Sequence, residues 1–129
     1  MSADTDWFLI PTTAPGLVKP GPTMPRQAFR ICRWSGQILI DPSGLRLDQT
    51  QPGIAELGTI PRWAAPAIAE QSFWINDDPS GIHQSVVAIH HGRTLYWVGT
   101  IVKGLLSVTR PASLHGGFQY VPDKPEEAP

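Results

Sequence analysis

Alternating apolar and polar positions in residues 28–48 predict short antiparallel β-strands. Apolar and polar side chains take turns along this segment, and two turn sequences, Ser35-Gly36 and Asp41–Gly44, interrupt it. The second sequence has aspartate, proline and glycine where a type I turn favours them. A period of two, broken by such turns, is typical of strands rather than helices. We therefore expect three short strands here.

The clearest hairpin is expected farther along the chain. Two segments, Ile82–His90 and Thr94–Val102, flank the turn His91-Gly92-Arg93, and this arrangement favours a long hairpin. Strict alternation places Leu95, Trp97 and Ile101 on one face of its second strand, and Tyr96, Val98 and Val102 on the other. Both faces are thus apolar, whereas a sheet with one solvated face alternates apolar and polar residues. We expect the hairpin either to be covered on both faces or to bind a partner there, with Tyr96 and Trp97 as the candidate contacts.

Further strands are expected around this hairpin, together with one short helical segment before it. Strand-like sequences occur at Phe73–Ile75, Leu105–Thr109 and Gly117–Val121, and a second Asp-Pro-Ser-Gly turn occurs at Asp78–Gly81. Helical composition is confined to residues 60–71, where Thr59 is a candidate N-cap. Pro66 lies inside that run and limits its length.

Residues 1–27 are expected to form an extended, proline-rich arm. Five prolines lie between positions 11 and 25, and each disfavours helix at its own position and at the preceding one. An apolar cluster precedes them, made of Trp7, Phe8, Leu9 and Ile10. This cluster is either a short first strand of the core or an anchor that docks on another subunit. Residues 28–121 would form the β-rich domain and residues 122–129 an irregular, solvated tail, so the predicted fold is mainly β, a small antiparallel barrel or sandwich.

Composition narrows the functional classes. The chain has 129 residues, of which only 16% are charged, against ~25% in typical soluble domains. Its net charge of −1 provides no overall attraction to nucleic acid or to an anionic membrane. No apolar segment approaches the ~20 residues of a membrane-spanning helix. The single cysteine excludes an internal disulfide framework and fits a reducing compartment.

Residues with catalytic or metal-binding chemistry form no recognisable motif. His90 and His91 are adjacent at a predicted strand end, so they point to opposite faces, and neither has metal-ligand spacing to His83 or His115. Cys32 lies between arginines and would be reactive if exposed, but a buried structural cysteine is commoner. The chain lacks the motifs of serine hydrolases, nucleotide-binding loops and zinc peptidases. We expect no enzyme, no catalytic residue, no cofactor and no metal.

Positive charge gathers near the first predicted hairpin. Arg26, Arg30 and Arg33 lie close in sequence to Trp34. Arginines interleaved with aromatic residues are typical of surfaces that hold single-stranded nucleic acid, yet such proteins carry a wider basic footprint than this slightly acidic chain. Tryptophan and arginine also dominate protein interfaces, so we expect this patch to bind a protein.

The sequence therefore favours a non-enzymatic structural subunit of a large multi-copy assembly, whose partners are copies of itself and other proteins of that assembly. By analogy of architecture alone, the leading hypothesis is a virion (phage) component, such as a head–tail connector, tail or capsid-decorating protein, located in the virion; otherwise we expect a cytoplasmic protein. The alternative is a soluble inhibitor or immunity-type protein-binding module, and the third hypothesis is a small nucleic-acid-binding protein or enzyme. We expect no membrane partner and no small-molecule substrate.

Overall fold

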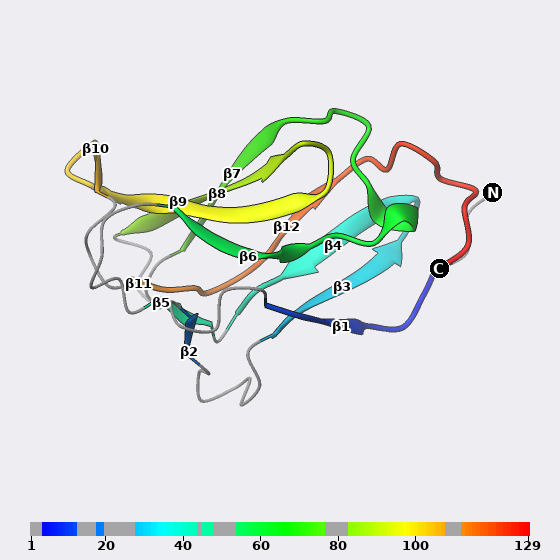
Figure 1. The fold of residues 1–129 in the computed structure, drawn as a ribbon, viewed down its shortest axis with the longest axis horizontal. Coiled ribbons are helices and arrows are strands. Elements are labelled where there is room, and N and C mark those ends of the chain that lie inside the picture. The colour runs from blue at the N-terminus through cyan, green and yellow to red at the C-terminus, as the bar shows by residue number, and fades with distance from the viewer. Residues whose placement is uncertain are drawn as a thin grey trace.

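The computed structural model describes residues 4–12, 18–19, 28–43, 45–47, 54–76, 83–107 and 112–129. This part of the chain is mainly β, and two antiparallel sheets face each other in a sandwich-like arrangement (Figure 1). Within these residues the sheets do not close into a barrel. The mainly β prediction is confirmed, and of its two forms the sandwich fits.

The first sheet has four strands, in the order β1-β3-β4-β12. They are β1 (Phe8–Pro11), β3 (Ala28–Trp34), β4 (Gln37–Asp41) and β12 (Phe118–Tyr120). The hairpin β3–β4 confirms the first predicted turn. Ser35 and Gly36 both have positive φ, at 51° and 79°, as the tight turns that match strand twist require.

The second sheet contains the long predicted hairpin at its centre, in the order β10-β9-β8-β7, with β6 beside β9. Its strands are β6 (Ala55–Thr59), β7 (Gln71–Asn76), β8 (Gln84–His90), β9 (Thr94–Val102) and β10 (Leu105–Ser107). The pairing of β8 with β9 confirms that hairpin. The second Asp-Pro-Ser-Gly turn, at 78–81, lies outside the described residues.

A small third group of strands lies beside the sandwich. It consists of β2 (Val18–Lys19), β5 (Arg46–Leu47) and β11 (Ala112–Ser113), with β5 in the middle. The third strand expected within residues 28–48 is therefore β5, and it pairs with β2 and β11 rather than with β4. The turn between Asp41 and Leu45 carries the chain out of the first sheet.

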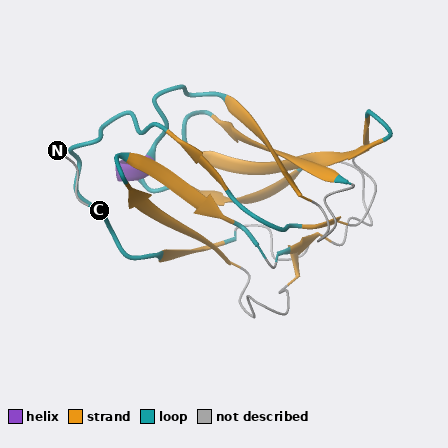
Figure 2. Ribbon diagram, turned by 180° about the vertical axis from the view of Figure 1, so that it is seen from behind, coloured by secondary structure: helices purple, strands orange, loops and turns teal. Residues whose placement is uncertain are grey.

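The predicted helical segment at 60–71 is much shorter in the structure. Only η1 (Arg62–Ala64), one 3₁₀ turn, is helical (Figure 2). Prolines on both sides of it, Pro61 and Pro66, supply no backbone N–H and prevent the turn from extending. Thr59 is not its cap, because this residue ends β6 and the turn has no side-chain cap.

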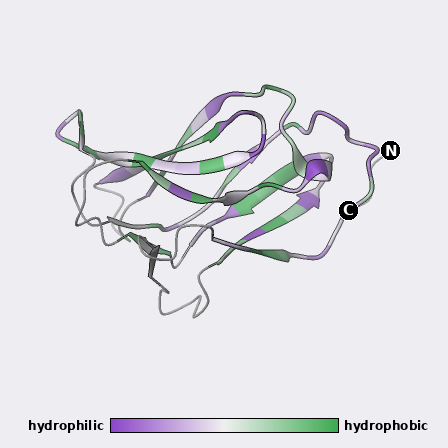
Figure 3. Cartoon of the chain, viewed as in Figure 1, coloured by the Kyte–Doolittle hydropathy of each residue, from purple (hydrophilic) through white to green (hydrophobic). Residues whose placement is uncertain are grey.

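The core lies between the facing sides of the two sheets. Alternation of hydropathy along β3, β4 and β9 is visible in Figure 3, and the inward residues are fully buried. The first sheet contributes Phe29, Ile31, Ile38 and Ile40, and the second contributes Val87, Ile89, Leu95 and Trp97. Inside this layer the indole N–H of Trp97 donates a hydrogen bond of 3.2 Å to Ser85 Oγ, which satisfies the one polar atom of that ring.

A β-bulge changes the predicted faces of β9. Trp97 lies opposite Val87, but Gly99, two residues on, lies opposite the adjacent Val86. The extra residue reverses the alternation, so Thr100 is fully buried while Ile101 is partly exposed. The prediction that Ile101 shares a face with Leu95 and Trp97 is therefore wrong.

Both ends of the described chain attach to the sandwich. Of the two alternatives for the cluster at residues 7–10, the structure has a first strand, because β1 pairs along β3. Of the rest of the predicted arm, residues 4–6, 11 and 12 and the strand β2 are described, and the other residues lie outside the described part of the chain. The C-terminal segment 122–129 contains no helix or strand, but it is not simply solvated. Pro122 is buried, and the backbone N–H of Asp123 donates a 2.8 Å hydrogen bond to the carbonyl of Ala65.

Candidate functional site

The outward side of the first sheet gathers the residues that the sequence singled out in two separate segments. Strand pairing sets Leu9 opposite Arg30, and Arg30 opposite Asp41, so these residues share one side of the sheet. This side, here called the tryptophan face, includes Trp7, Leu9, Arg30, Cys32, Trp34, Gln37, Leu39, Asp41 and Gln119. Pairing of β1 with β3 thus joins the predicted arm anchor to the predicted basic and aromatic patch.

Large apolar side chains on the tryptophan face are open to solvent. Trp7 is 44% exposed, Leu9 52% and Trp34 58%. Single exposed apolar residues are ordinary, but a group of them on one face marks a binding surface. The anchor residues Phe8 and Ile10 point the other way, Phe8 with its ring centroid 5.5 Å from that of Trp63 and Ile10 packed against the core.

Arg30 contacts both an aromatic ring and a carboxylate on this face. Its guanidinium carbon lies 4.6 Å from the centre of the Trp7 ring, a cation–π contact, and its Nη2 forms an ion pair with Asp41 Oδ2. Burial raises the pKa of Asp41, but hydrogen bonds from Ser43 and Arg30 outweigh burial and hold that pKa below its usual value. The carboxylate therefore neutralises Arg30, and Arg30 fixes the position of the Trp7 ring.

Arg33 corrects the prediction of a basic binding patch. Its side chain is buried, only 3% exposed, because it lies on the inward side of β3 with Phe29 and Ile31. The guanidinium donates 3.1 Å and 2.8 Å hydrogen bonds to the backbone carbonyls of Trp63 and Glu127. The Arg33 side chain thus holds the segments around Trp63 and Glu127 together, and its burial keeps it from contact with a partner. Arg26, the remaining member of that patch, lies outside the described residues.

The outward side of the second sheet carries apolar residues among polar ones such as Glu56, Gln84 and His90. Trp74, Val86, Tyr96, Ile101 and Leu106 lie there, here called the second outward face. Trp74 is 60% exposed and Leu106 51%, while Tyr96 is partly exposed. Of the two hairpin residues predicted to bind a partner, Tyr96 is accessible; Trp97 is fully buried in the core and cannot contact one.

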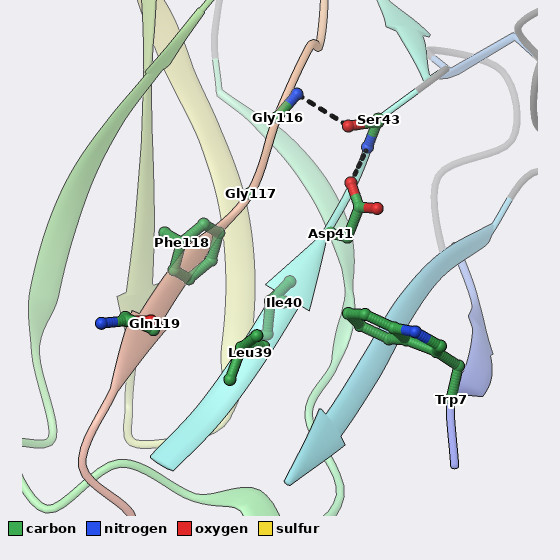
Figure 4. Close-up of a pocket in the computed structure, with 9 residues that line it drawn as sticks. All are labelled: Trp7, Leu39, Ile40, Asp41, Ser43, Gly116, Gly117, Phe118 and Gln119. Atoms are coloured by element: carbon green, nitrogen blue, oxygen red, sulfur yellow. Dashed lines mark hydrogen bonds between the residues drawn. The ribbon is translucent and has the colours of Figure 1, made fainter. Parts of the chain in front are cut away.

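A shallow cavity of about 420 Å³ opens at one end of the tryptophan face (Figure 4). Trp7 stands on one side of it, Gly117 and Gln119 on the other, and β4 runs between them with Leu39 and Asp41. Two hydrogen bonds hold its rim: Ser43 N donates to Asp41 Oδ1 at 2.9 Å, and Gly116 N donates to Ser43 Oγ at 2.7 Å. No signal in the sequence indicated this cavity, because its residues come from three distant segments.

The geometry offers little for catalysis. The described residues contain no group of three or more histidine, cysteine or acidic side chains able to hold a metal ion. His90 Nδ1 lies 3.3 Å from Glu70 Oε1 at an exposed site, and the ring centroids of His90 and His91 are 5.5 Å apart. Cys32 is buried, and burial raises its pKa, which disfavours the reactive thiolate.

Comparison with known proteins gives no information on function, so the two outward faces and the cavity are the features from which we infer one. None of the described helices has the length and hydropathy to cross a membrane. No protein-family model, no curated protein and no solved structure matches the chain.

Proposed function

We propose that this protein is a non-enzymatic structural subunit of a multi-copy assembly, bound to its neighbours through the tryptophan face and the second outward face. The observation that carries the proposal is the presence of exposed tryptophans on the outward sides of both sheets, Trp7 and Trp34 on one and Trp74 on the other. Burial of one such side chain contributes roughly 1.5–3 kcal/mol, so each face supplies a substantial part of a contact.

The two faces differ in chemistry, which favours a contact between unlike surfaces. The tryptophan face combines aromatic rings with the Arg30–Asp41 ion pair, whereas the second outward face is mostly aliphatic and aromatic. A face that binds a different face on the next copy gives rings or filaments, while a self-complementary face gives closed dimers. A virion component, such as a head–tail connector, tail or capsid-decorating protein, is the form of assembly we propose, with the virion as its location.

Charge on the tryptophan face supports protein rather than nucleic acid as the partner. Of the arginines in the predicted basic patch, Arg30 is paired with Asp41 and Arg33 is buried. Neutralised or buried arginines release no counterions on binding, so they add no salt-dependent affinity for a phosphate backbone. We therefore expect no nucleic-acid binding at physiological salt.

Two complementary variants test the assembly directly. Trp34→Ser removes an anchor from the tryptophan face and Trp74→Ser removes one from the second outward face, while Ile68→Ser changes an equally exposed apolar residue that belongs to neither. In sedimentation at roughly tens of micromolar, we expect wild type and Ile68→Ser to form large species and each tryptophan variant to lose them. In a mixture of the two variants, the intact tryptophan face of Trp74→Ser can bind the intact second outward face of Trp34→Ser. The other two faces are altered, so the mixture should form a one-to-one dimer.

Other outcomes of this experiment contradict the proposal. A wild-type chain that remains a soluble monomer at these concentrations would overturn self-assembly. A monomer that forms a tight one-to-one complex with a foreign protein, sensitive to Trp34→Ser but not to Trp74→Ser, would instead support the inhibitor or immunity-type module.

A further inference from the structure

The described residues that line the cavity beside Trp7 offer a ligand no unpaired charged group. Among the described residues that line it, Asp41 is the only one with an ionisable side chain, and its carboxylate is already paired with Arg30. A phosphate or carboxylate ligand would find no free cation among these described residues, and a cationic ligand would have to displace Arg30. The cavity therefore selects a neutral ligand.

The remaining lining groups suit a ring with one apolar side and several hydroxyls. Trp7 supplies an aromatic surface, and Arg30 holds that ring in place without lining the cavity itself. Gln119 and Asp41 face the same side of the sheet as Trp7, so an amide and a carboxylate lie across from the aromatic ring. At about 420 Å³, the space falls within the ~300–1,000 Å³ of small-molecule sites.

We propose that this cavity binds a neutral saccharide, with the C–H face of one pyranose ring stacked on Trp7 and its hydroxyls hydrogen-bonded to Gln119 and Asp41. A saccharide fits better than a flat aromatic ligand because the opposite wall offers Gly117 and Gln119, while the ring of Phe118 on that wall is stacked on Phe73 against the core. Both carboxylate oxygens of Asp41 keep further lone pairs after their bonds to Ser43 and Arg30. This site goes beyond the proposed assembly and does not rest on it.

Titration of the full chain with sugars in a Trp74→Ser background, which lacks the anchor of the second outward face and is expected not to form large species, tests the site when followed by NMR of the tryptophan indole N–H signals. The probes are glucose, galactose, mannose and N-acetylglucosamine, and their disaccharides, each raised to roughly 50 mM, because an open site with one aromatic wall gives dissociation constants around the millimolar range. We expect the Trp7 indole signal to shift in a saturable way with at least one of these sugars. Trp34, on the same face but outside the cavity, should not shift.

Matched variants separate the site from the fold. Binding by these variants is read from the backbone amide signal of Gly117, which lines the cavity, because the Trp7 variants have no indole at that position. Trp7→Ala should abolish the shifts of this amide, Gln119→Ala should weaken binding roughly tenfold, and Trp7→Tyr should retain binding because a ring remains. Trp34→Ala is the control and should bind as the Trp74→Ser parent chain does. Equal shifts in Trp7→Ala, or no shift with any of these sugars in the parent chain, would overturn the proposal; so would saturable binding of inorganic phosphate or a proline-rich peptide in their place. Because Trp7 belongs to both proposals, Gln119→Ala distinguishes them: it removes no exposed tryptophan, so weaker sugar binding with unchanged assembly supports the saccharide site independently of the assembly.

Discussion

Removal of the C-terminal residues 124–129 should destabilise the sandwich through Arg33. The guanidinium of this buried residue donates 2.8 Å and 3.1 Å hydrogen bonds to the carbonyls of Glu127 and Trp63, and its Nε has no partner among the described residues. Truncation after Asp123 removes the carbonyl of Glu127, so the carbonyl of Trp63 is the one of these two acceptors that remains. The buried charge would then lose half of its hydrogen bonds to protein.

The size of this effect follows from the contacts. A hydrogen bond to a charged group contributes ~1.5–3 kcal/mol, and the exposed ion pair of Arg62 with Glu127, at 3.1 Å, adds about 0–1 kcal/mol. Water that reaches Arg33 after truncation offsets part of the loss. We therefore expect the free energy of unfolding to fall by roughly 1–3 kcal/mol, which lowers Tm by about 3–15 °C for a chain of this size.

Urea unfolding followed by tryptophan fluorescence measures this loss, and two further variants test its cause. Deletion of Pro129 alone removes an exposed residue and keeps the Glu127 carbonyl in a peptide bond, so it should leave the midpoint unchanged. In an Arg33→Met background the longer truncation should cost at least about 1 kcal/mol less than in wild type. Equal costs in both backgrounds would refute the reasoning, because the segment would then be held by something other than Arg33.

Three further predictions concern single residues. Because the folded-state pKa of Asp41 is lowered, its stabilising contribution is complete above the unfolded value of ~3.9 and is lost as the pH falls through the folded value; urea midpoints between roughly pH 2 and 5 should therefore fall less in Asp41→Asn than in wild type. Cys32 is buried with a raised pKa, so a thiol reagent at neutral pH should label it only in denaturant; rapid labelling of the native chain would contradict its burial. At Gly117 a Cβ would lie 2.5 Å from the carbonyl oxygen of Ile40, so Gly117→Ala should lower the free energy of unfolding by roughly 1–3 kcal/mol, and an unchanged urea midpoint would show that β12 can shift away from β4.

Local patterns in the sequence were enough to predict the hairpins but not every strand. The alternation in β3, β4, β8 and β9 is strong, and each hairpin has its own turn residues. The strand β6 was missed because Ala, Glu and Gly have weak strand preference and its sequence, AELGT, contains all three. It is a strand because it pairs with β9 and because Gly58 leaves room for the Phe29 ring, which would lie 2.8 Å from a Cβ there.

The candidate site could also be predicted only in part from local sequence patterns. The sequence singled out Trp7, Arg30 and Trp34 as binding residues, but their meeting on one face depends on pairing between β1 and β3, which no local pattern encodes. The bulge that turns Ile101 outward is equally invisible in the spacing of apolar residues. Burial of Arg33, by contrast, was detectable, since it shares the period-two phase of Phe29 and Ile31, which are core residues.

Arg33 also couples the two ends of the described chain. Its backbone N–H donates to Thr5 Oγ1 and its carbonyl accepts from Thr5 N, both at 2.9 Å, while its side chain binds the carbonyl of Glu127. The segments around Thr5 and Glu127 lie near each other at the same end of the molecule (Figure 1). Fraying of either segment loosens the residue that the other depends on, so the two should open as one unit. Native-state hydrogen exchange would then report a single shared opening free energy for the amides of Thr5 and Glu127, although these residues stand at opposite ends of the sequence.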